Sequence, residues 1–281
     1  MATCVLAVHL TARSQQQQTE SAAQATPSTE EHFLNWQDNS LSVLPYGWNY
    51  EVDPSHQSTL TYEHVHASAI GDLFVFVDAT AFHDTDGDDS TWYAEVSPRF
   101  SLGKITGRDL SFTLFSRSLF DVKDVLIAAQ YERGEDDDVA EAALLGVGFD
   151  LDIRDPGLLG PLSKFQYIQL NLYARSELAE GVKHGFRDMQ VTMVAARPVT
   201  RGRYRWLFDG YFDWVLGFGS EDWSYHVNPQ LRLDIGNFHG NPEKMYVGIE
   251  ADFWWNKYQI PDSSGFPTNQ AAWSLLFKYH F

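Results

Sequence analysis

Tyrosine, carboxylate and arginine side chains recur at every second position of several segments of the chain. In TWYAEVSPRFSL, residues 91–102, Tyr93, Glu95 and Arg99 alternate with apolar residues. An aromatic ring can stack, a carboxylate accepts hydrogen bonds and a guanidinium donates them. Candidate binding residues chosen by this alternation are Tyr93, Glu95, Arg99, Tyr167, Asn171, Tyr173, Arg175, Asp209, Tyr211, Asp213, His226, Arg232, Glu250 and Asp252. The alternative is that acids and bases pair with one another and only fill and rigidify an interior.

The sequence contains no recognisable catalytic constellation. It has no nucleophile elbow, no phosphate-cradling glycine loop and no CxxC pair. Ser220 or Ser224 with the nearby His226 could form a serine nucleophile and its histidine base, but spacing alone supports this poorly. We therefore expect no enzyme activity, no catalytic residue and no cofactor.

An aspartate-rich loop and the histidines are the two features of the sequence that could indicate metal sites. The loop DTDGDDSTWYAE places Asp84, Asp86, Asp88 and Glu95 at positions 1, 3, 5 and 12 of a calcium loop, but its glycine is at position 4 instead of 6. An external, solvated loop is the better prediction. Histidines follow no metal-ligand spacing, so no metal site is expected. The histidines assigned to the polar faces are His226 and His280, with His64 and His66 as further candidates.

Period-2 alternation predicts that these polar side chains are carried by β-strands. The apolar residues do not recur at helical spacing, and the segments are rich in aromatic and β-branched residues. Twelve strands are expected, near 39–48, 57–67, 71–82, 91–102, 122–132, 139–151, 164–176, 185–197, 203–217, 223–235, 244–256 and 271–281. Residues 111–122 are ambiguous and could form a short amphipathic helix. One domain, 33–281, is expected after a disordered lead-in or imperfect signal peptide over 1–32.

Composition narrows the class of protein. The 281 residues carry a net charge of −18, and 15% are aromatic. The pI of about 4.8 argues against nucleic-acid binding, which needs a clustered basic surface. Mean hydropathy is −0.31 and no run of about 18 apolar residues occurs, which leaves soluble all-β proteins and transmembrane barrels. Cys4 is the sole cysteine, so no intrachain disulfide can form.

Three observations favour apolar faces that point outward to lipid. Aromatic residues gather at the ends of the apolar faces, as the girdles of a membrane barrel do. Acidic connections 83–91, 133–138 and 218–222 fall on one side of the predicted barrel. The connections on the other side carry Lys104, Arg108, Arg154, Arg197 and Arg201. The closing WSLLFKYHF, 273–281, is predicted to be the last strand and to pair with the first near Leu41 and Val43, leaving no open edge.

Several stretches resemble the Tsx-type nucleoside-specific channels of Gram-negative outer membranes, a family that includes the OmpK proteins. They are NWQDNSLSVL (35–44), WYAEVSPRFSLGKITGRDLSF (92–112), NLYARSELA (171–179), YFDW (211–214) followed by GSED, and the closing KYHF. The resemblance implies a monomeric twelve-stranded antiparallel barrel that passively admits nucleosides through the bacterial outer membrane.

The partners implied are outer-membrane lipid and lipopolysaccharide, nucleosides, and the outer-membrane assembly machinery acting through the C-terminal strand, with no nucleic acid. Some members of the family serve as bacteriophage receptors. A surface receptor or adhesion barrel with only incidental pore activity is therefore the alternative function, and a soluble all-β binding protein is the third.

Overall fold

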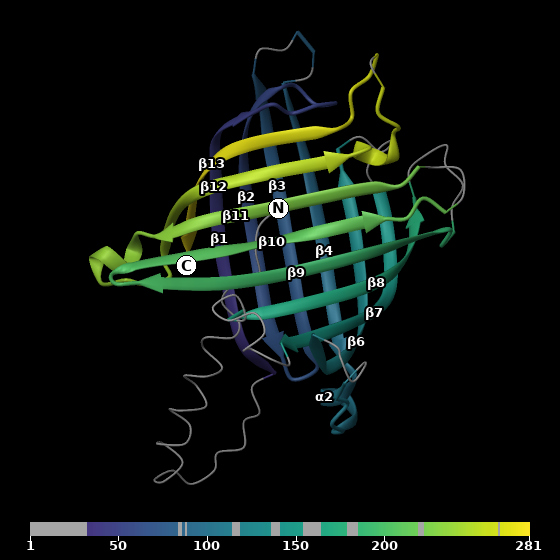
Figure 1. Cartoon of the computed structure of the whole chain (residues 1–281), viewed down its shortest axis with the longest axis vertical. Coiled ribbons are helices and arrows are strands. Elements are labelled where there is room, and N and C mark those ends of the chain that lie inside the picture. Colours follow the sequence, from purple (N-terminus) through teal and green to yellow (C-terminus); the bar gives the residue numbers. More distant parts are fainter. Residues whose placement is uncertain are drawn as a thin grey trace.

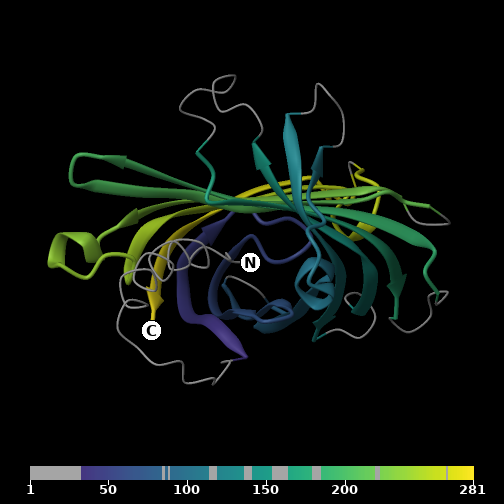
Figure 2. The same ribbon diagram turned by 90° about the horizontal axis from the view of Figure 1, so that it is seen from below.

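The computed structural model describes residues 33–281 except 84–85, 88, 114–118, 136–140, 154–163, 179–184, 219–221 and 264. Strands make up most of the described part of the chain. Its strands curve around a common interior, and those of the near wall cross those of the far wall (Figure 1). Figure 2 shows the same ribbon from below. Such crossing is expected when tilted strands close into a barrel.

Twelve strands form the ring in the described residues, which confirms the number expected from the alternation. They are β1 (Leu34–Trp48), β2 (His56–Ser68), β3 (Gly71–His83), β4 (Ser90–Ser101), β6 (Phe120–Gly134), β7 (Glu141–Ile153), β8 (Tyr167–Glu177), β9 (Asp188–Arg201), β10 (Tyr204–Val215), β11 (Ser224–Asp234), β12 (Met245–Trp255) and β13 (Gln270–His280). The largest difference from the expected bounds is at the first strand, which begins five residues earlier than expected.

Neighbours in the ring are neighbours along the chain, so the topology is an antiparallel meander. The ring closes where β1 pairs with β13, with Leu41 opposite Tyr279 and Val43 opposite Phe277. This is the pairing expected of the C-terminal segment. Closure gives the edge groups of both strands hydrogen-bond partners, which a spanning sheet requires because lipid supplies none.

The last strand shows how the faces are oriented. Leu275, Phe277 and Tyr279 are 41%, 52% and 51% exposed on the outside, whereas Lys278 and His280 are each 2% exposed on the inside. The polar residues are therefore internal and the apolar residues external, the inverse of a soluble barrel. Aromatic rings also pack together on the outer face, as in the contacts of Tyr225 with Phe212, Trp214 and Trp223.

The β4–β6 connection differs from the expectation for residues 111–122. A short helix is present, but it is α2 (Leu102–Thr106), capped at its start by Ser101 and ended by the left-handed Gly107. Residues 112–113 form β5 (Phe112–Thr113), which pairs with β6 outside the ring, and β6 has already begun at Phe120. A helix over the whole of 111–122 is therefore wrong.

Two placements of charged residues also need correction. Arg197 and Arg201 lie within β9, not in a connection. His64 and His66 lie on the outer face of β2, because Thr61 and Glu63, 1% and 3% exposed, occupy the inward positions of the same strand. Residues 136–138, Arg154 and the lead-in 1–32 are outside the described residues, so the corresponding expectations stay predictions.

The remaining described helical turns are η2 (Gly236–His239) and η3 (Lys257–Gln259), both in connections between strands. Among the described residues, no helix is both long enough and apolar enough to cross a membrane.

The outward apolar face can be tested at the middle of β13. Leu275→Arg should lower the free energy of unfolding in lipid vesicles by about 2–4 kcal/mol, because an arginine at mid-bilayer depth must leave water. Denaturant titration followed by heat-modifiable gel mobility measures the change. Phe266→Arg, in the connection 256–269, is the matched control and should change stability by less than about 1 kcal/mol. Equal effects of the two variants would contradict the lipid-facing assignment.

Candidate binding cavity in the barrel lumen

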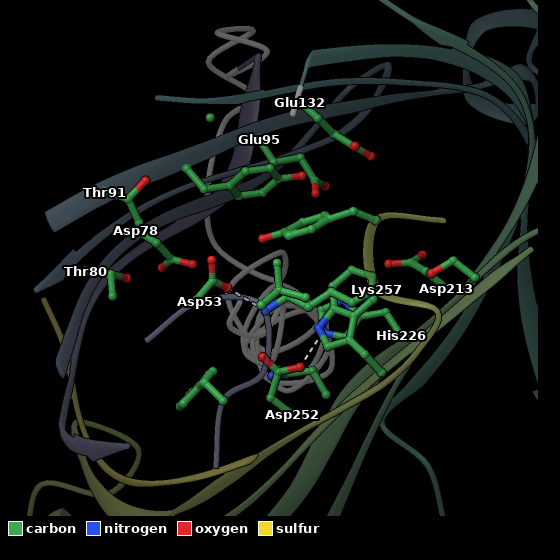
Figure 3. A pocket seen from close by; sticks show the side chains of 18 of the residues that line it. Asp53, Asp78, Thr80, Thr91, Glu95, Glu132, Asp213, His226, Asp252 and Lys257 are labelled. Carbon is green, nitrogen blue, oxygen red and sulfur yellow. Dashed lines mark hydrogen bonds and ion pairs between the residues drawn. The ribbon is translucent and has the colours of Figure 1, made fainter. Parts of the chain in front are cut away.

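A cavity of about 730 Å³ occupies the half of the lumen that lies away from the ends of β1 and β13 that carry the chain termini. Its lining side chains come from strands on all sides of the ring, together with the connections 49–55 and 256–269. Figure 3 shows carboxylates and hydroxyls projecting into this space from facing walls. The volume lies within the range of ordinary small-molecule sites.

One wall is acidic and is organised around Arg175. Glu95 of β4 and Glu132 of β6 occupy directly paired positions on adjacent strands. The Arg175 guanidinium contacts Glu132 at 2.9 Å and Glu177 at 2.6 Å. Asp213 accepts hydrogen bonds from Gln190, at 3.2 Å, and from Thr192. Arg175 therefore compensates part of the acidic wall and fixes its geometry.

The adjoining wall, formed by β10, β11 and β12, combines aromatic rings with a histidine. Trp254 stacks on His226 with ring centroids 3.7 Å apart and an interplanar angle of 16°. His226 Nε2 lies 2.7 Å from Asp252 Oδ1, and the Tyr211 hydroxyl lies 2.9 Å from His226 Nδ1. The dashed contact between His226 and Asp252 is visible in Figure 3. Because these contacts hold both rings, Trp254 presents a fixed aromatic surface to the cavity.

The connections 49–55 and 256–269 both contribute side chains to the cavity lining. Lys257, the first residue of η3, places its Nζ 2.5 Å from Asp53 Oδ2, 3.0 Å from Gln270 Oε1 and 3.2 Å from the Glu51 carbonyl oxygen. Burial of the ammonium opposes its charge, but the neighbouring Tyr258 and Asp53 outweigh burial and raise the pKa of Lys257. The lysine therefore stays charged and ties the two connections together.

The backbone around Lys257 is unusual. Asn256, Tyr258 and Gln259 have φ values of 51°, 57° and 59°, in the left-handed region that non-glycine residues seldom adopt. Tyr50, in the other connection, makes a 3.0 Å hydrogen bond with Ser274. Burial, with the negative charges of Asp252 and Glu250, raises the pKa of Tyr50, so its hydroxyl stays protonated. These contacts hold both segments at the mouth of the cavity.

Eight of the residues expected from the sequence line this cavity. They are Tyr93, Glu95, Arg175, Tyr211, Asp213, His226, Glu250 and Asp252. The residues that alternation did not single out include Glu132 and Trp254, which share the inward parity of their strands, and Asp53 and Lys257, which come from connections without any periodic pattern. Parity could have found the first two, whereas no sequence signal marks the other two.

The other six expected residues lie outside the cavity lining, in a more tightly packed part of the lumen. Arg99 contacts Asp72 at 2.7 Å and Asp150 at 3.0 Å, and Arg232 is fully buried against Asp209. Tyr173 packs with Ala128, Ala142 and Leu144, and Tyr167 packs against another buried cluster. Asn171 is 5% exposed. Here the alternative considered for the sequence, pairing that fills the barrel, describes the geometry of Arg99, Asp209 and Arg232.

The calcium-like loop and the two serines near His226 were the other candidate sites in the sequence. Asp84 and Asp88 of the calcium-like loop and Ser220 are outside the described residues. Ser224 donates a 3.3 Å hydrogen bond to the Trp255 carbonyl oxygen. Its hydroxyl proton therefore does not point to His226, as it would in a serine–histidine pair. Within the described ranges, no group of three or more histidine, cysteine, aspartate or glutamate residues could hold a metal ion.

The lining carries a strong negative charge. Nine carboxylates face the cavity, against two permanently charged bases, Arg175 and Lys257. The carboxylates are Asp53, Asp78, Glu95, Glu132, Glu135, Glu177, Asp213, Glu250 and Asp252. An acidic lining that also contains a fixed aromatic surface can hold a small solute that donates hydrogen bonds and offers a flat ring, and it disfavours anions.

An inverted, closed barrel with a polar, aromatic-lined cavity defines an outer-membrane channel for small solutes. The model of the family described as "Nucleoside-specific channel-forming protein, Tsx" matches residues 34–281, and the chain belongs to this family. The location is therefore the bacterial outer membrane.

Two relatives and one solved structure illustrate the similarity. The nucleoside-specific channel-forming protein Tsx of Escherichia coli O157:H7 is 24% identical over 89% of this chain and 90% of that protein. The outer membrane protein OmpK of Vibrio parahaemolyticus is 23% identical over 86% of this chain and 83% of that protein. A solved KdgM porin has a TM-score of 0.44 and 9% identity, covering 88% of this chain and 99% of the porin.

The acidic lining should make the open barrel select cations. In a potassium chloride gradient, Glu95→Gln or Glu132→Gln should lower the ratio of potassium to chloride permeability by roughly fivefold, since one charge at ~4 Å in water is worth about 1 kcal/mol. Reversal potentials in planar bilayers measure the ratio. Asp109→Asn, in the β4–β6 connection at the other end of the barrel, should leave it unchanged. The same ratio in all three variants would show that the cavity does not control ion passage.

Proposed function

We propose that this barrel passively admits nucleosides across the outer membrane, down their concentration gradient. Membership of the Tsx family supports this substrate class. The observation that carries the proposal is that one cavity is lined both by the fixed Trp254 ring and by carboxylates on the facing wall. A nucleoside needs both, because its base is a flat ring and its sugar carries hydroxyl groups.

The base would stack on Trp254, with Tyr211 and Tyr93 as further aromatic contacts. Stacking accepts every base, since each has a π-face. The sugar hydroxyls would donate to Glu95, Glu132 and Asp213. Each of these contacts is weak, which suits a channel, because a solute must leave the site as readily as it enters.

The packed part of the lumen would form the rest of the route. Arg99, Arg232 and Asp209 have charged partners there and are at most 4% exposed, so they would hold the walls of the route in place instead of binding the solute. Tyr167, Asn171 and Tyr173 would pack the same walls. In this proposal, eight of the fourteen residues expected from the sequence would face the solute and six would support the packed part of the lumen.

The biological unit we propose is a monomeric barrel over residues 33–281, preceded by the separate segment 1–32. Its outer face would contact lipid and lipopolysaccharide. Its last strand and the following Phe281, with Phe277 and Tyr279 also exposed, would be the segment recognised by the outer-membrane assembly machinery. No nucleic-acid partner is proposed, since the net charge is −18.

Single-channel recording tests the substrate class directly. Adenosine or thymidine at millimolar concentration should reduce the ion current through the reconstituted barrel, because a nucleoside in the cavity displaces ions. Glucose at the same concentration should have a smaller effect, since it has hydroxyl groups but no ring to stack. A current that falls with glucose and is unchanged by nucleosides would overturn the proposal.

A pair of adjacent tryptophans tests the binding mode. Trp254→Ala should weaken nucleoside block of the current by about 5-fold to 150-fold, which corresponds to the ~1–3 kcal/mol of one stacked base. Trp255→Ala is the matched control, because Trp255 is 44% exposed on the outer face of the same strand. It should leave nucleoside block unchanged. Equal weakening by both substitutions would mean that Trp254 acts only through barrel stability.

A further inference from the structure

A group of polar side chains interrupts the apolar outer face where β1 and β2 approach the end of the barrel that carries the termini. It consists of Asn39 of β1 and Tyr62, His64 and His66 of β2, and it is called the histidine patch here. The adjacent strand is apolar at the paired positions, with Val77 opposite Tyr62, Val75 opposite His64 and Leu73 opposite His66. Ionisable side chains on a lipid-facing surface are costly and commonly mark functional sites.

The hydrogen bonds within the patch assign the protons of His64. Its Nδ1 lies 3.0 Å from Asn39 Oδ1, and an amide oxygen only accepts, so Nδ1 carries the proton and donates. The lone pair of His64 therefore lies on Nε2. The Tyr62 hydroxyl also donates to Asn39 Oδ1, at 2.8 Å, which holds the amide in this orientation.

The lone pair of His64 is directed toward a second imidazole. His64 Nε2 and His66 Nδ1 are 3.0 Å apart, and the two rings meet edge to face with centroids 5.3 Å apart. With metal–nitrogen distances of ~2.0–2.1 Å, two ligands are about 2.9 Å apart at the right angle of an octahedral site and about 3.3 Å apart at the tetrahedral angle that Zn²⁺ prefers. The observed separation lies at the octahedral end of this range, and the proton that His66 Nδ1 donates in the metal-free pair would reside on His66 Nε2 when the metal binds.

We propose that His64 and His66 form a two-coordinate protein site for a transition-metal dication of the Zn²⁺ or Ni²⁺ type on the outer face of the barrel. Asn39 is the positioning residue, because a ligating histidine usually donates its other ring N–H to an oxygen that fixes its tautomer. Water or lipid phosphate oxygens would complete the coordination. Imidazole favours Zn²⁺, Cu²⁺ and Ni²⁺ over Ca²⁺ and Mg²⁺, which prefer oxygen ligands.

This site is independent of the nucleoside cavity, since it lies on the other face of the β1–β2 wall. The position of the site on two strands explains why the spacing of histidines along the sequence did not predict it. The two ligands follow the i, i+2 spacing of one strand face, and the third component, Asn39, comes from a different strand.

The test is zinc titration of the full chain, folded in detergent micelles at pH 7.5 and freed of metal with EDTA. Isothermal calorimetry should show one equivalent of Zn²⁺ bound by the wild-type protein and lost in His64→Asn and in His66→Asn. Asn39→Ala should weaken binding by about 10-fold to 100-fold, the usual effect of removing such an oxygen partner. Heat-modifiable gel mobility checks that each variant is folded.

A second pair of histidines provides the matched control. His56 and His83 face one another across β2 and β3 at the opposite end of the barrel, and both are exposed. The double variant His56→Asn/His83→Asn should keep the equivalent of Zn²⁺ that His64→Asn loses. Wild-type binding no greater than that of His64→Asn would overturn the proposal and leave a plain imidazole–imidazole hydrogen bond. Displacement of Zn²⁺ by an equal concentration of Ca²⁺ would also overturn it.

Discussion

The backbone hydrogen bonds between β1 and β13 are the constraint on which the rest of the structure depends. A strand edge left open in hydrocarbon would leave several N–H and C=O groups without hydrogen-bond partners, each at a cost of several kcal/mol. The pairing of Leu41 with Tyr279 and of Val43 with Phe277 removes that edge. It also sets parity, because a shift by one residue would turn Lys278 and His280 outward and Phe277 and Tyr279 inward.

Once parity is set, the barrel has to accommodate many ionisable groups in its interior. One part of the lumen does so by pairing, as Arg232 does with Asp209, Lys278 with Glu63 and His280 with Asp38. Pairing and hydrogen bonding offset part of the free-energy cost of taking these charges out of water. Elsewhere the excess of acids surrounds open space instead. The division between a packed part and an acidic cavity is therefore a division between charges that have partners and charges that a solute can reach.

Most of the fold could be predicted because it rests on a local, period-2 signal. The twelve strands, the outward apolar face and the closing pair near Leu41 and Val43 all follow from alternation and from the need to close the sheet. Connections were predicted poorly, because no period governs them: α2 was missed, and the contribution of Lys257 of η3 to the cavity lining could not be foreseen. The ion pair between Lys257 and Asp53 joins residues that are 204 positions apart.

The candidate site shows the same limit. Alternation identified which side chains face the lumen, and eight of the fourteen expected residues line the cavity. It could not separate Tyr211, which reaches the cavity, from Tyr173, which is buried among alanines and a leucine, because both have inward parity. His64 and His66 were candidates for the inner face, because both faces of their strand are polar near its end and polarity alone could not indicate which face was internal.

The most direct measurement is the initial rate of uptake of radiolabelled adenosine and of sucrose into vesicles that contain the purified barrel. A selective passage with a stacking surface and hydroxyl-binding carboxylates predicts that adenosine at low micromolar concentration enters many times faster than sucrose, and that excess thymidine slows adenosine but not sucrose. Equal rates for the two solutes, with no competition by thymidine, would contradict the account and describe an unselective pore.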